Sequence, residues 1–567
     1  MIKNRLSIHL FSSISILIVA FIIVYLKYNP IFFATNDDGT ISNLANGFYT
    51  GQVSNELIYT SKIYGDILTF FYSNFPDLQW HGIYIFTTVL LSIIVLAKEI
   101  IYSTENNKLI IKIGIFLIVL NLYLVFIISP TFTMASLISG YTAVIIFYKN
   151  LLTRLNQIVI PLLLLFNSFI IRPDGFLAIA YFLIPGIIYF IYCAYKRDKI
   201  IVTNFLIFVP TLLIFFYESW RKQIIRNSSK EWDNYWQFLN AFHVVDTNPS
   251  MLKMHQAIAA FQIPGLKWTN VEATLLHSVS YLDPVVFSGS QMEIAKNYVL
   301  NFIGYRGLLN AEVIPTLVRV WEYMQYISLL FFALLAVIII FTLMSQNIKT
   351  SLMFLVGFFY VFFLYYYLGA VWRIPPRINI PIIFMLIIGI LILVSYSKKI
   401  DSRLNLIAVS LSLVLIVCYQ FQATGFVGLS EKLVTRQIEQ EMISEELNRV
   451  NTNGIFIGQI RYGSESYSNA FVTFSRYKSL DLTTGWQVFS PAWNYKVRQL
   501  GILDGNPVPL LTYKQNTYWV SDGYIAEVMA MYLNDNQLKW KGICVVGNLP
   551  NGGKVISYQM IENKCNQ

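Results

Sequence analysis

Two adjacent carboxylates, Asp37 and Asp38, stand in a polar stretch directly after the first apolar run of the chain. Neighbouring side chains on a helix point about 100° apart, so one aspartate can face a pocket while the other faces the protein. A partly desolvated carboxylate can take a proton from a hydroxyl group. General-base chemistry is therefore one interpretation of this pair.

The other interpretation of the pair is structural. Thr35 or Asn36 can cap a helix that begins here, which would put both carboxylates in its first turn. The helix dipole stabilises negative charge at that position. The sequence leaves both roles open.

Three arginines could bind an anion near this stretch. Arg172 belongs to an Arg-Pro-Asp-Gly segment that also contains Asp174, and Arg373 and Arg377 flank a Pro-Pro pair. A planar guanidinium matches two phosphate oxygens, which lysine cannot do. Anchoring at the membrane surface explains Arg172 equally well, and contact with lipid headgroups explains the other two almost as well.

The remaining reactive side chains form no metal-ligand spacing. His243 is a candidate supporting residue, as is Asp174, and His81 is interpreted as a membrane-interface residue. No metal site is therefore expected. Cys544 and Cys565 could form a disulfide if their part of the chain is extracytoplasmic.

Composition decides the broad class of the protein. Of the 567 residues 56% are hydrophobic and only 13% charged, whereas a soluble protein carries about 25% charged residues. Apolar runs of about 17–25 residues recur along the chain, each long enough to cross a bilayer. The sequence predicts a polytopic, multi-pass α-helical membrane protein with about 11 transmembrane helices.

The predicted spans place the polar residues on two sides of the membrane. They cover about 7–27, 82–97, 110–128, 132–148, 155–171, 176–195, 201–217, 324–349, 351–371, 378–396 and 404–421. With the N-terminus in the cytoplasm, strict alternation keeps the basic short loops inside, except the loop of Arg373 and Arg377. The net charge of +10 thus fits the positive-inside rule, and no nucleic-acid partner is expected.

The same alternation defines two domains. Residues 1–421 form a transmembrane domain with external loops 28–81 and 218–323, and residues 422–567 form a small extracytoplasmic α/β domain. The tail alternates β-like runs (454–460, 543–546 and 554–560) with a helix-like segment at 524–533. The loop 218–323 is predicted to be helical and amphipathic. Its aromatic residues suit the headgroup level of a membrane: Trp220, Trp232, Tyr235, Trp236, Phe238, Trp268 and Tyr281.

A family resemblance is carried by the first external loop. Residues 36–39 (Asn-Asp-Asp-Gly), 47–51 (Gly-Phe-Tyr-Thr-Gly) and 68–76 (Leu-Thr-Phe-Phe-Tyr-Ser-Asn-Phe-Pro) resemble the GT-C superfamily of integral-membrane glycosyltransferases that use polyprenyl-phosphate sugars. The nearest likeness is to bacterial cell-surface polysaccharide and glucosyltransferase proteins. The architecture agrees over roughly residues 1–420.

The resemblance implies roles for the candidate residues. In the family a first-loop acidic residue acts as the base or positions the acceptor, and external basic residues hold the donor phosphate. Carried over, Asp37 or Asp38 takes the first role, and Arg172, Arg373 and Arg377 take the second.

The expected function is a glycosyltransferase at the outer face of the bacterial plasma membrane. It would move a sugar from a polyprenyl-phosphate donor to a cell-surface glycan, lipid or wall polymer in cell-envelope polysaccharide biosynthesis, with membrane lipids around it. Direct displacement would invert the anomeric centre. No cofactor or metal is expected, because arginine can neutralise one phosphate.

Three alternatives stay open at this point. A polysaccharide polymerase or ligase would use the same chemistry with a glycan-lipid donor. A transporter or flippase of lipid-linked sugars would need polar groups inside the spans, where Asn167 is a rare candidate. A non-catalytic assembly or sensor protein would use its outer domain to bind wall polymer.

Overall fold

The computed structural model describes twelve main stretches and isolated residues between them. These are residues 36–47, 52–102, 130–153, 159–175, 229–247, 263–278, 280–304, 376–395, 445–458, 487–502, 504–550 and 552–559.

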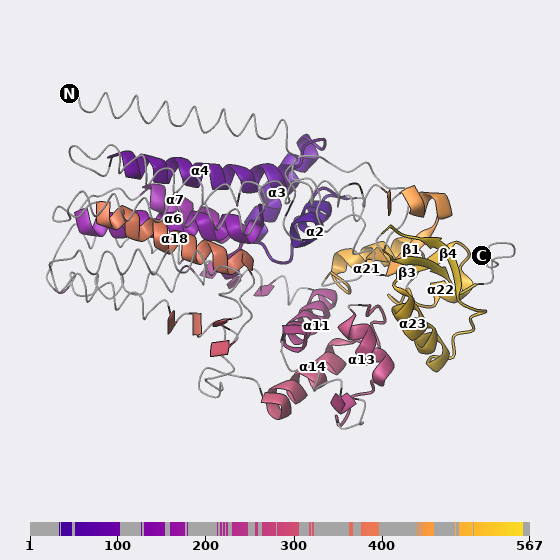
Figure 1. Cartoon of the computed structure of the whole chain (residues 1–567). Coiled ribbons are helices and arrows are strands. Elements are labelled where there is room, and N and C mark those ends of the chain that lie inside the picture. The colour runs from indigo at the N-terminus through magenta and orange to yellow at the C-terminus, as the bar shows by residue number, and fades with distance from the viewer. Residues whose placement is uncertain are drawn as a thin grey trace.

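Four long helices lie side by side and form one lobe of the molecule (Figure 1). They are α4 (Trp80–Tyr102), α6 (Phe132–Thr153), α7 (Val159–Ile171) and α18 (Pro376–Ser395). Helix α6 is central, since it packs against the other three. Each of the four coincides with a predicted span. In lipid, a single apolar segment can satisfy its backbone hydrogen bonds only by forming a helix.

Two of these helices meet the length and hydropathy expected of a membrane span among the described residues. They are Trp80–Glu99 and Phe132–Asn150, whereas Val159–Ile171 and Arg377–Leu386 are shorter apolar segments. The other predicted spans lie outside the described residues, so their number stays a prediction.

A polar cluster ties three helices of the bundle together. Tyr84 Oη donates to Asn167 Oδ1 at 2.7 Å. Asn167 Nδ2 lies 3.1 Å from Thr88 Oγ1 and 3.4 Å from Ser139 Oγ. Interhelical hydrogen bonds of this kind hold helices together in membranes. Asn167, the residue on which the transporter alternative depends, is thus engaged in helix packing.

The two ends of the bundle differ. At one end, Lys149 of α6 forms an ion pair with Glu99 of α4, with side chains 5% and 4% exposed. At the other end lie α2 (Asn36–Ala45) and α3 (Lys62–Asn74) (Figure 1). Helix α18 also begins at this end, with Pro376 as its first residue. Proline lacks a backbone N–H, and this costs nothing in the first turn, where N–H groups have no acceptor within the helix.

Side-chain hydrogen bonds hold α2 and α3 to the start of α4. Ser42 Oγ donates to Gln79 Oε1 at 2.5 Å, and Tyr72 Oη donates to the same oxygen at 2.6 Å. The Ser61 hydroxyl caps α3 by accepting from the Tyr64 amide at 3.1 Å. The described residues of the 28–81 segment, which is predicted to be external, therefore pack as a cap on this end of the bundle.

The described part of the predicted 218–323 loop is largely helical, as expected. It contains α11 (Lys230–Thr247), α13 (Asn270–His277), α14 (Gly289–Tyr298) and a π-helical turn, Val299–Gly304. The interpretation of its aromatic residues as a membrane-surface layer is wrong for most of them, because the structure buries their rings in a hydrophobic core. The buried residues are Trp232, Tyr235, Phe238, Trp268 and Tyr281, whereas Trp220 is exposed.

The C-terminal part folds around a mixed five-stranded sheet with the order β2-β1-β3-β5-β4. The strands are β1 (Ile455–Gly458), β2 (Leu482–Thr483), β3 (Thr517–Ser521), β4 (Cys544–Asn548) and β5 (Lys554–Ser557). β1 is parallel to β2 and β3, and the remaining pairs are antiparallel.

The described helices beside this sheet include α21 (Pro491–Gln499), α22 (Leu510–Tyr513) and α23 (Gly523–Asp535). Strands β1, β4 and β5 and helix α23 overlap the β-like runs and the helix predicted from the sequence. The predicted domain boundary at 421 lies outside the described residues. Cys544 is disulfide-bonded, and its partner also lies outside them.

Polar contacts dock the C-terminal part onto the helices of the 218–323 segment. The Asp283 carboxylate accepts from Asn506 Nδ2 at 2.6 Å and from Tyr532 Oη at 3.0 Å. Arg498 of α21 forms an ion pair with Glu231 of α11. Burial and the neighbouring Asp283 raise the pKa of the Tyr532 hydroxyl above its usual range, which keeps this hydroxyl a donor.

Candidate functional site

The first candidate carboxylate lies against an arginine that is 340 residues away in the sequence. Asp37 is in the first turn of α2, and its Oδ2 accepts from Arg377 Nη1 of α18 at 3.0 Å. Their side chains keep 12% and 24% of their surface exposed. The prediction that both aspartates occupy the first turn of a helix is confirmed.

The second arginine stands at the end of α7, beside the start of α6. The Arg172 guanidinium donates to Thr133 Oγ1, and it lies over the Phe132 ring, 4.9 Å from its centroid. Burial lowers the pKa of Arg172, and the Asp174 carboxylate opposes that effect. An aromatic face and a hydroxyl thus hold this cation in a half-buried position.

Tyr59 joins these groups to the long helix α11. Its ring lies 5.9 Å from the Arg172 guanidinium carbon, and its hydroxyl is 3.1 Å from His243 Nε2. Burial and then the charge of Asp37 raise the pKa of Tyr59, whereas Arg172 and Arg377 lower it. The tyrosine therefore lies within electrostatic reach of all three charged side chains.

Asp38 occupies a different environment from Asp37. Its carboxylate is fully buried and accepts from the Phe132 backbone N–H at 2.7 Å, at the N-terminus of α6. His81 Nε2 lies 3.3 Å from the same oxygen. The other nitrogen of that ring is 2.8 Å from Tyr64 Oη. The geometry assigns Asp38 to the packing of α2, α4 and α6 and leaves Asp37 to face the arginines.

The structure thus brings together most of the predicted site residues. Asp37, Arg172, His243 and Arg377 converge around Tyr59, and exposed Asp174 lies within electrostatic reach of Arg172. Arg373 lies outside the described residues. His81, interpreted as an interface residue, is instead buried beside Asp38.

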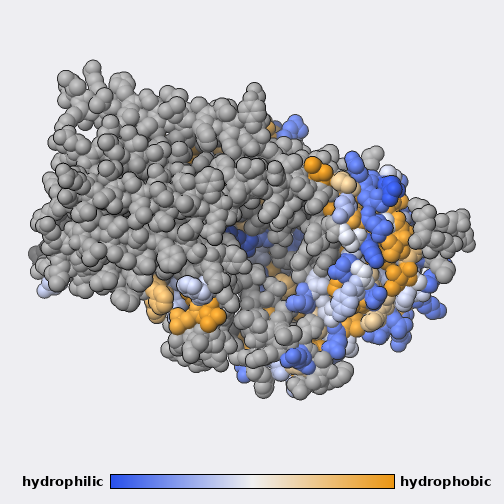
Figure 2. Space-filling view, viewed as in Figure 1, coloured by the Kyte–Doolittle hydropathy of each residue, from blue (hydrophilic) through white to orange (hydrophobic). Residues whose placement is uncertain are grey.

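The cluster of Asp37, Tyr59, Arg172, His243 and Arg377 is called the ionic cluster below. It draws on the ends of α2, α7 and α18, which meet at one end of the bundle (Figure 1). Near that end of α18, Figure 2 shows a hollow with hydrophilic residues on its floor. Two cations beside one carboxylate and a phenol can bind an anion and accept a proton.

Sequence reasoning missed Tyr59 and Thr133 as members of the site, and it missed the contact of His81 with Asp38. Tyr59 stands in an irregular segment, where no periodicity indicates which way a side chain points. His81 carries a signal in principle, because a histidine at the start of an apolar helix must have its ring nitrogens satisfied when it is buried. Its partner Asp38 is 43 residues away in the sequence.

Two solved structures match the chain over nearly its whole length. The crystal structure of ArnT from Cupriavidus metallidurans in the apo state matches with a TM-score of 0.37 and 14% identity, covering 98% of both chains. That of the same protein bound to undecaprenyl phosphate matches with a TM-score of 0.36 and 12% identity, covering 99% of both.

No family model and no curated protein sequence matches the chain. TM-scores below 0.5 carry no argument about function, so the proposed function rests on the residues of this chain.

Proposed function

We propose that this protein is a multi-pass glycosyltransferase of the bacterial plasma membrane. It transfers a sugar from a polyprenyl-phosphate donor to a cell-surface glycan, lipid or wall polymer on the outer face. The observation that carries the proposal is the ionic cluster, in which Asp37 meets Arg377 at 3.0 Å and Arg172 lies nearby. Charged groups gathered in a partly desolvated place are typical of functional sites.

The two arginines would hold the donor phosphate. Arg172 is preorganised by Thr133 and the Phe132 ring. The Arg377 Nε atom is buried and has no acceptor among the described residues, so it can donate to a phosphate oxygen. Two guanidinium groups can offset the charge that develops on a leaving phosphate, which is why the proposed reaction uses no metal ion.

Asp37 would act as the general base. The acceptor hydroxyl oxygen bonds to the anomeric carbon while the bond from that carbon to the phosphate oxygen breaks, and its electron pair leaves with the lipid phosphate. The hydroxyl proton moves to the Asp37 carboxylate, and this single displacement inverts the anomeric centre. A phosphate that competes for Arg377 also loosens the pair with Asp37, so donor binding frees the base.

The decisive variant is Asp37→Asn, which keeps the shape of the side chain and removes its basicity. We expect transfer to fall by about 10²–10⁴-fold, the usual contribution of a general base. The measurement is the release of polyprenyl phosphate by the full-length protein in proteoliposomes containing polyprenyl-phosphate sugars.

The matched control is Asp38→Asn, one residue away. Because Asp38 is buried in the packing of α6, we expect this variant to lose thermal stability before it loses turnover per folded molecule. Wild-type transfer by Asp37→Asn would contradict the proposed base. A larger loss of turnover in folded Asp38→Asn than in Asp37→Asn would reverse the two roles.

A further inference from the structure

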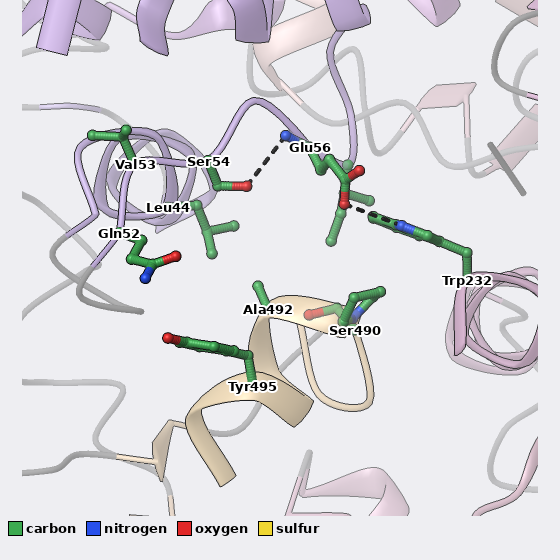
Figure 3. Close-up of a pocket in the computed structure, with 11 residues that line it drawn as sticks. Leu44, Gln52, Val53, Ser54, Glu56, Trp232, Ser490, Ala492 and Tyr495 are labelled. Atoms are coloured by element: carbon green, nitrogen blue, oxygen red, sulfur yellow. Dashed lines mark hydrogen bonds between the residues drawn. The ribbon is translucent and has the colours of Figure 1, made fainter. Parts of the chain in front are cut away.

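A second site lies beside the ionic cluster, between three segments that are far apart in the sequence. It is a cavity of about 190 Å³. Leu44, Gln52 and Glu56 come from the first external segment, Trp232 from α11, and Ala492 and Tyr495 from α21 of the C-terminal part. Figure 3 shows the first-segment side chains on one side of the cavity and those of α21 on the other.

The chemistry of this cavity differs from that of the ionic cluster. Among the described residues, Glu56 is the one charged side chain that lines the cavity, and the uncharged polar lining consists of serine, glutamine and tyrosine side chains. The Glu56 carboxylate accepts from Trp232 Nε1 at 3.1 Å, which fixes both side chains at the wall. A negative, uncompensated lining repels phosphate and other anions. The cavity therefore does not suit the donor headgroup.

Aromatic faces combined with hydrogen-bonding side chains fit a neutral sugar. The ring of a sugar carries apolar C–H faces that pack on indole or phenol rings, while its hydroxyls need donors and acceptors at the rim. Tyr495 offers an exposed ring, the largely buried Trp232 forms part of the wall, and Gln52 and Glu56 offer polar groups. Tyr495 is 37% exposed, so it is available to a ligand.

The cavity also stands next to the proposed chemistry. Ile58 lines the cavity, and the following residue, Tyr59, contacts Arg172 and His243 in the ionic cluster. Consecutive Cα atoms are about 3.8 Å apart. The cavity and the ionic cluster are therefore linked through adjacent residues of one segment.

We propose that this cavity binds a neutral oligosaccharide, the glycan end of the acceptor, and that the C-terminal part contributes α21 to complete it. Binding stands independently of catalysis, whereas the role as acceptor subsite rests on the proposed function. The docking contacts of Asp283 and Arg498 then keep α21 in place to line the cavity.

The test is saturation-transfer NMR on the full-length protein in nanodiscs, with cellotetraose, maltotetraose and tetra-N-acetylchitotetraose as probes. We expect the wild type to bind at least one probe. Tyr495→Ala removes an exposed ring, and Ala492→Trp fills the cavity; each should weaken binding by about tenfold or more. The control is Tyr524→Ala, which removes a more exposed ring (65%) from α23, away from the cavity, and should bind as the wild type does.

The outcomes separate the two proposals. If the wild type binds none of the three probes, or if both cavity variants bind as tightly as the wild type, the cavity is not a sugar site. If the cavity variants lose binding but Asp37→Asn keeps wild-type transfer, the sugar site stands and the proposed function fails. In a transfer assay, a true acceptor subsite raises the acceptor KM in Tyr495→Ala and leaves the donor KM unchanged.

Discussion

At one end of the helix bundle, Glu99 and Lys149 pair with each other, and both side chains are almost completely shut off from solvent. At the other end, Asp37 and Arg377 pair while Arg377 keeps about a quarter of its side-chain surface open. A second arginine, Arg172, stands nearby with an aromatic ring and a hydroxyl as its visible supports.

The difference separates an ion pair that serves packing from one that can exchange partners. Burying an ion pair costs the free energy of desolvating both charges. Each buried charge therefore needs its partner to remain in place. In the open cluster, the Arg377 Nε atom has no acceptor among the described residues, which leaves a donor for an incoming anion. Burial, rather than the presence of charge, distinguishes the two ends.

The largest expected effect is at the closed end. Lys149→Met leaves the Glu99 carboxylate buried without its cation, so we expect a loss of about 3–5 kcal/mol in stability. Thermal unfolding of the protein in nanodiscs measures it. The double variant Glu99→Leu, Lys149→Met should recover most of the loss, and a stable Lys149→Met single variant would show that the pair is not closed.

At the open end, Arg377→Gln and Arg172→Gln should weaken donor binding more than they lower the stability of the fold. Each removes charged hydrogen bonds to the proposed donor phosphate, which are worth about 1.5–3 kcal/mol. We expect the donor KM to rise by about ten- to a hundredfold, with smaller changes in melting temperature. Arg377→Lys keeps the charge, so recovery in this variant would show that a forked donor is unnecessary. An unchanged donor KM in both glutamine variants would contradict the phosphate site.

A smaller effect concerns Tyr72 of α3, whose hydroxyl donates to Gln79. Burial raises the pKa of Tyr72 to about 12, above its unfolded value of about 10. Between these two pH values the folded protein keeps a proton that the unfolded chain has released, so stability falls by about 1.4 kcal/mol per pH unit. This contribution is complete below about pH 10 and is lost toward pH 12.

Tyr72→Phe should therefore reduce by one the number of protons released on unfolding at alkaline pH. Its stability should then fall less steeply with pH than that of the wild type. Melting temperatures followed from about pH 8 to pH 11 provide the slope. Equal slopes in the variant and the wild type would show that this hydroxyl does not stay protonated in the folded state.

The smallest expected effect belongs to the ion pair that faces solvent. Arg498 and Glu231 keep 49% and 38% of their side chains exposed, and such pairs are worth about 0.2–1 kcal/mol. Arg498→Gln should lower the melting temperature only slightly, and the difference should shrink in high salt. A loss as large as that of Lys149→Met would remove the distinction between open and closed pairs.

Part of the candidate site could be predicted from the sequence, because the predicted spans assign its charged residues to one side of the membrane. Asp37 and Arg377 are 340 residues apart, and counting spans assigned them to the same side. Hydropathy thus located three helix ends without any knowledge of side-chain packing.

The division of roles between the two aspartates could not be predicted. Adjacent carboxylates in a first turn are equivalent until the neighbouring helix is known, and it is the Phe132 amide that makes Asp38 structural. The aromatic residues of the 218–323 segment were misassigned for a similar reason. Tyrosine and tryptophan suit both a membrane interface and a core around Tyr281, and composition alone does not distinguish them.

The fold of the C-terminal part was predicted incompletely. Strand β3 (Thr517–Ser521), at the centre of the sheet, was missed, because its five residues are all buried and show no alternation. A short continuous run of this kind cannot be told from part of a buried helix by its period. Its neighbours β1 and β5 were found because they lie beside glycine- and asparagine-rich turns.

The pairing of Asp37 with Arg377 also has a consequence for biosynthesis. A separation of 340 residues, at a synthesis rate of about 5–20 residues per second, delays the arginine by roughly 17–68 s. During that interval the aspartate has already left the ribosome while the cation that balances it does not yet exist. The ionic cluster can therefore be completed only late in translation, and a nascent chain that stops before α18 lacks it.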